Sequence, residues 1–133
     1  MPDEPGRPAT DELRSIAAAT PGLALLLLFG SRARADGRPD SDWDFGYLAD
    51  ASTDLEGLRT ALVLATGTDR IDMADLDRAG ALLRYRAARD GRLVYEREPG
   101  VDGRFRLAAA DFWCDAGPLL RQAYANVLGE LGR

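Results

Sequence analysis

The sequence predicts a single domain of the mixed α/β (α+β) class, with a small sheet flanked by helices. Short apolar runs of strand length alternate with longer segments in which apolar residues recur at helical spacing. The resulting order is helix–strand–strand–helix–strand–helix–strand–helix, which is typical of a small mixed sheet with helical cover. At 133 residues the chain is long enough to bury roughly two thirds of its unfolded surface in one domain.

The N-terminal segments predict an arm, a helix and a buried strand. Residues 1–10 are rich in proline and charge and are expected to form a mobile arm, which leaves 11–133 as the domain. Thr10 is expected to cap the first helix, and a Pro-Gly pair ends it. The next seven residues, 23–29, are all apolar, so we expect a central strand that is buried on both faces.

A polar loop and a second strand follow. The loop spans residues 31–41, and its first part is also compatible with a short helical turn. Residues 43–48 predict the second strand. Asp54 is then expected to cap a helix that ends near Gly67.

The remaining elements are a strand over 71–76, a helix over 77–90 with Asp77 as its cap, a strand over 92–96, and a helical region over 103–131.

The third predicted helix carries three arginines. Arg84, Arg86 and Arg89 are expected on a solvent-exposed face, with contact to a nucleotide or a partner as the alternative.

Composition narrows the possible chemistry. The net charge is −5 and all 17 basic residues are arginine, an acidic balance that argues against direct nucleic-acid binding. The absence of histidine excludes Ser-His-Asp and Cys-His mechanisms, so carboxylates, hydroxyls, arginine and metal ions remain. One cysteine allows no intramolecular disulfide, and no apolar run is long enough to span a bilayer. We therefore expect a cytoplasmic protein without membrane contact.

Two neighbouring carboxylates provide the most informative chemical signal. Asp42 and Asp44 are two positions apart at the start of the second strand, so their side chains project to the same face. At about 6 Å, two carboxylates repel by about 3 kcal/mol at an effective dielectric near 20. A cation between them relieves that repulsion, and oxygen ligands suit Mg²⁺ held together with substrate phosphates. The pair therefore predicts a site for a metal and a nucleotide.

A third carboxylate and a small-residue turn complete this prediction. Asp72 lies within an apolar strand, where an unpaired charge is expensive to bury, so we expect it to face the first pair. Gly30 and Ser31 end the buried strand, where their N–H groups and the serine hydroxyl are suited to bind phosphate. Arg32 is expected to add positive charge near the phosphates. Ser41 either binds the nucleotide or ends the loop.

These residues resemble the signature of the DNA polymerase β-like nucleotidyltransferase superfamily. The resemblance is carried by Gly30-Ser31-Arg32-Ala33-Arg34, by Ser41-Asp42-Trp43-Asp44 and by Ile71-Asp72-Met73-Ala74-Asp75-Leu76. It extends over about residues 11–96, and the nearest branch is that of the minimal nucleotidyltransferases, which are short single-domain proteins. Trp43 is bulkier than the aliphatic residue more usual between the two acids, and Phe45-Gly46 replaces an aliphatic continuation.

The resemblance implies Mg²⁺-dependent transfer of AMP from ATP to a hydroxyl, with two metal ions. Asp42 and Asp44 would hold both ions, and Asp72 would assist the ion that activates the acceptor or take its proton. Gly30, Ser31, Arg32 and Ser41 would bind the nucleotide. The implied partner is a HEPN-domain toxin, in a hetero-oligomer of a type VII toxin–antitoxin pair, and the acceptor is one of its tyrosines. The alternatives are an inactive protein that inhibits its partner by binding only and a nucleotidyltransferase acting on small molecules such as aminoglycosides.

Overall fold

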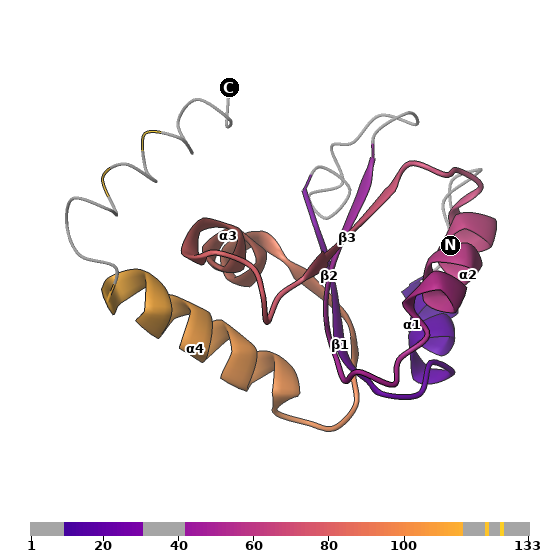
Figure 1. Ribbon diagram of the computed structural model, residues 1–133, viewed down its shortest axis with the longest axis horizontal. Helices are drawn as coiled ribbons and strands as arrows, with labels where there is room; N and C mark the ends of the chain where they lie inside the picture. The colour runs from indigo at the N-terminus through magenta and orange to yellow at the C-terminus, as the bar shows by residue number, and fades with distance from the viewer. Residues whose placement is uncertain (1–9, 31–41, 116–121, 123–125, 127–133) are drawn as a thin grey trace.

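The protein has a three-layer arrangement, with the sheet in the middle. The computed structural model describes residues 10–30, 42–115, 122 and 126. Figure 1 shows the sheet between α1 and α2 on one side and α3 and α4 on the other. The elements are α1 (Thr10–Ala18), β1 (Leu23–Phe29), β2 (Trp43–Ala49), α2 (Leu55–Thr66), β3 (Ile71–Asp75), α3 (Ala81–Asp90), β4 (Arg92–Glu96) and α4 (Val101–Asp115).

The four strands of the sheet lie in the order β3-β2-β1-β4. β1 pairs antiparallel with both β2 and β4, whereas β3 pairs parallel with β2. The parallel pair requires a crossover, which α2 provides. The predicted fold class, a small mixed sheet with helical cover, is confirmed.

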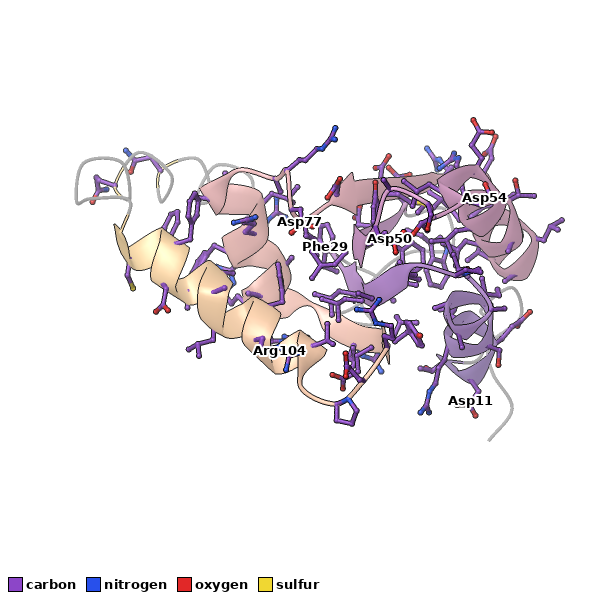
Figure 2. All side chains as sticks on the ribbon, turned by 60° about the horizontal axis from the view of Figure 1, so that its bottom comes forward. Asp11, Phe29, Asp50, Asp54, Asp77 and Arg104 are labelled. Carbon is purple, nitrogen blue, oxygen red and sulfur yellow. The ribbon has the colours of Figure 1, made fainter. Side chains whose placement is uncertain are left out.

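β1 is buried on both faces, as the sequence predicted. Leu26 and Leu28 belong to an apolar cluster that includes residues of α1 and α2. Leu25, Leu27 and Phe29 belong to a second cluster with residues of α3 and α4. We call the two sides of the sheet the α1/α2 face and the α3/α4 face. In Figure 2, Asp11 on α1 and Arg104 on α4 mark the two helical layers.

The ends of α2 are formed as predicted. The Asp54 carboxylate accepts a hydrogen bond from the Gly57 N–H at 2.9 Å, which caps the first turn. After the last turn Gly67 adopts a left-handed conformation with φ of 76°, and its N–H donates to the Val63 carbonyl. Figure 2 shows Asp54 at the start of this helix.

Three helix starts differ from the prediction. Thr10 lies within the first turn of α1 instead of capping it. α3 begins at Ala81 because the Asp75 carboxylate accepts a hydrogen bond from the Asp77 N–H at 3.0 Å, and this turn keeps residue 77 out of the helix. α4 begins at Val101 because the Glu96 carboxylate accepts hydrogen bonds from the N–H groups of Gly100 and Asp102, at 3.1 and 3.2 Å.

Residues 1–9 of the predicted arm, the loop over 31–41, and residues 116–131 of the predicted C-terminal helical region, except for 122 and 126, lie outside the described residues. Among the helices that the structure describes, none combines the length and the apolar character needed to cross a bilayer.

Candidate active site

Asp44 is placed by the hairpin of β1 and β2. It lies opposite Phe29 in the antiparallel ladder, and Gly30 directly follows that residue. Gly30 has a φ of 79°, and a Cβ atom on it would lie 2.4 Å from Asp44 Oδ2. Glycine suits this position because it adopts a positive φ without strain and leaves the space beside the carboxylate free. The predicted proximity of the small-residue turn to the acidic pair is therefore present for Gly30.

Asp72 lies beside Asp44. The two residues are register partners in the parallel ladder of β2 and β3. Burial raises the pKa of Asp44 to about 6, with further contributions from the charge of Asp72, from the charge of Asp42 and from a hydrogen bond with Asp72. The ladder thus brings two carboxylates from separate strands into one small space on the α3/α4 face.

Asp42 has a different environment. It immediately precedes β2 and is exposed, and its Oδ1 lies 3.5 Å from Nε of Arg70. Arg70 precedes β3, and its carbonyl accepts a hydrogen bond from the Trp43 N–H at 2.9 Å, which helps to hold the beginnings of β2 and β3 together. The charge of Asp42 reaches Asp44, but its carboxylate is engaged with an arginine.

The acidic residues partly fit a magnesium site. Within residues 10–30 and 42–115, no three histidine, cysteine, aspartate or glutamate side chains are gathered closely enough to bind a metal ion together as they lie. Asp44 and Asp72 nevertheless form a pair of close carboxylates whose mutual repulsion a cation would relieve. Mg²⁺ in nucleotide sites is usually held by one or two carboxylates together with substrate phosphates. The pair meets this requirement, whereas the Asp42 carboxylate lies against Arg70.

The unusual residues of β2 have structural roles. Trp43 and Phe45 are buried on the α1/α2 face and stack nearly parallel, with ring centroids 6.2 Å apart. Gly46 leaves room for Leu76, because a Cβ at position 46 would lie 3.0 Å from its methyl groups. These residues pack the core on the strand that carries Asp44.

Two arginines of the site region were not among the predicted site residues. Arg59 of α2 donates hydrogen bonds to the carbonyl of Ile71 and, at 3.1 Å, to that of Asp69, so it fixes the start of the strand that carries Asp72. Arg86 of α3 is half-buried, and its charge lowers the pKa of Asp44. From the sequence, Arg86 was expected on a solvent-exposed face, and a contact to a nucleotide or a partner was only the alternative. Ser31, Arg32 and Ser41 lie outside the described residues.

Comparison with known families agrees with this geometry. Residues 11–100 match the model of the family described as polymerase beta, nucleotidyltransferase. The chain belongs to this nucleotidyltransferase family. The matched region contains Gly30, Asp42, Asp44 and Asp72, and it ends just before α4.

Similar proteins are found among both sequences and structures. The chain is 33% identical over 110 residues to the protein adenylyltransferase MntA of Aphanizomenon flos-aquae (strain 2012/KM1/D3), covering 70% of this chain and 72% of that protein. It resembles a chain in the crystal structure of a toxin–antitoxin complex with AMP-PNP, with a TM-score of 0.68 and 21% identity over 93% of this chain and 98% of that one. A structure of a tri-AMPylated Shewanella oneidensis HEPN toxin with its MNT antitoxin gives a TM-score of 0.60 and 20% identity, covering 94% and 100%. At these identities the structural likeness shows the fold.

Proposed function

We propose that this nucleotidyltransferase transfers AMP from ATP to a tyrosine hydroxyl of a HEPN-domain toxin and thereby neutralises it as an antitoxin. The observation that carries the proposal is the close pair of Asp44 and Asp72 beside Gly30, in a chain that is 33% identical to a protein adenylyltransferase. The structural relatives that contain a toxin, AMP-PNP or an AMPylated HEPN protein support the same partner and the same donor.

Asp42 and Asp44 would hold two Mg²⁺ ions together with the triphosphate, and Asp72 would share the ion next to the acceptor. When bound, Mg²⁺ would neutralise charge on the phosphates and on the reacting oxygens. The chain's own groups do the rest. The Gly30 N–H would donate to a phosphate oxygen beside the carboxylates. An Asp72 carboxylate oxygen takes the proton of the tyrosine hydroxyl, which has an ordinary pKa near 10 and therefore needs a base at neutral pH.

The reaction balances without a further reactant. The tyrosine oxygen forms a bond to the α-phosphorus of ATP, and the bond from that phosphorus to the bridging oxygen of the β-phosphate breaks. Pyrophosphate leaves with the bonding electrons, and the tyrosine proton passes to Asp72. The acceptor becomes an AMP ester of tyrosine.

A protein acceptor is able to approach from the side of β3. This strand is an edge of the sheet in the described part of the chain, and Asp72 on it is exposed. A tyrosine on the surface of a partner is therefore able to reach the carboxylate without a change in the sheet. A stable hetero-oligomer with the toxin and a cytoplasmic location belong to the same proposal.

Labelling of the toxin tests the proposal. The protein is incubated with Mg²⁺, ATP labelled in its α-phosphate and the HEPN protein encoded beside it, and label is expected on a toxin tyrosine. Asp42→Ala with Asp44→Ala is expected to abolish labelling. The matched control is Asp77→Ala with Glu98→Ala, two exposed residues whose side chains make no hydrogen bond or ion pair in the described structure.

Neutralisation is measured in parallel as rescue of growth. If the Asp42/Asp44 double variant still neutralises the toxin although labelling is lost, the protein neutralises by contact, and the proposal that AMP transfer neutralises the toxin is wrong. If the wild-type protein labels an aminoglycoside but no protein, the substrate is a small molecule and the partner assignment is wrong.

A further inference from the structure

The three arginines of α3 differ in what they contact. Arg84 donates to the main-chain oxygens of Leu76 and Asp77 at 2.8 and 3.0 Å. Arg89 forms a double hydrogen bond with the carboxylate of Asp90, at 2.9 and 2.8 Å. Arg86, between them, makes no hydrogen bond or ion pair with any residue that the structure describes.

Arg86 is nevertheless not an ordinary surface arginine. It is half-buried, so part of its side chain packs against the protein. It precedes the fully buried Ala87 and follows Leu83 by three positions, and both of these residues pack in the cluster on the α3/α4 face. Its position on the helix therefore places it at the rim of that cluster. A guanidinium at this rim without an acceptor among the described residues keeps its hydrogen-bond donors available for an anionic ligand.

The α3/α4 face is also the face of the acidic residues. Trp43 and Phe45 point to the α1/α2 face, so Asp44 between them points toward α3 and α4. The C-terminal end of α3 approaches β1 closely, since a Cβ on Gly91 would lie 3.4 Å from a methyl carbon of Leu27. Arg86 is close enough for its charge to lower the pKa of Asp44, yet it forms no ion pair with this carboxylate.

We propose that Arg86 binds the triphosphate of the nucleotide substrate from the side of α3, opposite the carboxylates. This inference rests on the proposed function of the site. The carboxylates are able to hold phosphates only through metal ions, whereas a guanidinium binds phosphate oxygens directly with two parallel hydrogen bonds. A triphosphate with three carboxylates and two divalent ions keeps a net negative charge, so a cation on the open side stabilises the complex. Negative charge that develops on the departing pyrophosphate strengthens this contact in the transition state.

Nucleotide binding by an Arg86→Gln variant tests the proposal. Affinity for AMP-PNP with Mg²⁺ is measured by titration calorimetry at pH 8, where Asp44 is ionised in both proteins. Loss of a charged hydrogen-bond donor is expected to weaken binding roughly 10- to 100-fold. Affinity for AMP, which has no β- or γ-phosphate, is expected to change much less. Arg86→Lys keeps the positive charge but not the two parallel donors of the guanidinium. Its affinity for AMP-PNP is expected to lie between those of the wild-type protein and Arg86→Gln.

A second measurement separates binding from support of the fold. Arg86→Gln removes no hydrogen bond or ion pair to the described residues, so its thermal midpoint is expected to fall only slightly, through the lost attraction to the Asp44 carboxylate. The control is Arg14→Gln, which makes the same charge change at an exposed residue of α1, on the other side of the sheet, and is expected to leave AMP-PNP affinity unchanged.

The outcomes distinguish this inference from the proposed function. If the wild-type protein binds AMP-PNP and labels the toxin while Arg86→Gln binds AMP-PNP equally well, the Arg86 assignment is wrong and the function stands. An equal loss for AMP and AMP-PNP excludes a contact to the β- and γ-phosphates and also overturns the assignment. If the wild-type protein neither binds AMP-PNP nor labels a partner, the function itself fails and the assignment fails with it.

Discussion

The two faces of β2 contain neighbouring residues with opposite tasks. Trp43 and Phe45 are 2% and 0% exposed and pack in the apolar cluster of the α1/α2 face. Asp44 lies between them in sequence, but it points to the α3/α4 face, where it meets Asp72 at the cost of a raised pKa. Because side chains alternate along a strand, one segment is able to anchor the core and present the carboxylates. Stability and chemistry are therefore expected to respond to different residues of β2.

Replacement of Asp44 is expected to have the largest effect on activity. Asp44→Asn keeps the size of the side chain but removes a carboxylate that would hold Mg²⁺, which is worth several kcal/mol of transition-state stabilisation. AMP transfer to the toxin, measured as initial rate of labelling, is expected to fall by about a thousandfold or more. The thermal midpoint at pH 8 is expected to rise, because a half-buried charge near two others is removed.

Asp44→Asn is therefore expected to lower activity without lowering stability. A fall in activity together with a fall in thermal midpoint would mean that Asp44 supports the fold, and the comparison between the faces would fail. Asp77→Asn is the control, since it removes an exposed carboxylate beyond β3.

Phe45→Ala is expected to have the converse effect. Phe45 is among the largest fully buried side chains, and its truncation leaves a cavity in the cluster of the α1/α2 face. The free energy of unfolding in urea is expected to fall by about 3–5 kcal/mol, which is a large part of the stability of a small domain. Labelling per folded molecule, measured at low temperature, is expected to fall far less than for Asp44→Asn. A loss of less than about 1 kcal/mol would contradict the assignment of Phe45 to the core.

Gly30→Ala is expected to lower both stability and labelling, each by an intermediate amount. The positive φ of Gly30 makes any L residue strained by about 1–3 kcal/mol, and the added Cβ also meets Asp44 Oδ2 at 2.4 Å. Gly67→Ala is a matched control, because Gly67 has nearly the same φ of 76° but nothing within 4 Å of the added atom. Both variants are expected to lose stability in urea, and only Gly30→Ala is expected to lose labelling by displacing the carboxylate. Equal labelling by the two variants would exclude the close approach of Gly30 as a feature of the site.

The difference between the faces also explains what the sequence was able to predict. Apolar runs and alternation are local signals, so the strands and the common face of Asp42 and Asp44 were predicted from residue spacing alone. The start of α4 was missed because its cap, Glu96, belongs to β4, and the start of α3 was missed because Asp75 bonds to Asp77 in a turn. Arg86 was left open because the rotation of α3 is set by how Ala87 packs against the sheet. Such contacts depend on tertiary structure and leave no periodic pattern.

The smallest expected effect is a pH dependence of stability that originates on the α3/α4 face. The pKa of Asp44 is raised from 3.8 to about 6 in the folded protein. Between these two pH values the folded protein keeps a proton on Asp44 that the unfolded chain releases. The contribution of this proton to the free energy of unfolding is therefore complete below about pH 4 and is lost as the pH rises through 6. Since Asp44 is only half-buried, solvent screening reduces the effect to about 1 kcal/mol.

Thermal midpoints of the wild-type protein and Asp44→Asn between pH 4 and pH 8 measure this dependence. The wild-type protein is expected to lose stability relative to the variant as the pH rises, because only the wild-type protein must ionise a carboxyl group beside two others. Mg²⁺ binds the ionised form, so its addition is expected to raise the wild-type midpoint more at pH 8 than at pH 5 and to leave the variant nearly unchanged. A difference between the two proteins that stays constant with pH would mean that Asp44 is ordinarily solvated. The repulsion that a metal ion relieves in the proposed site would then be absent.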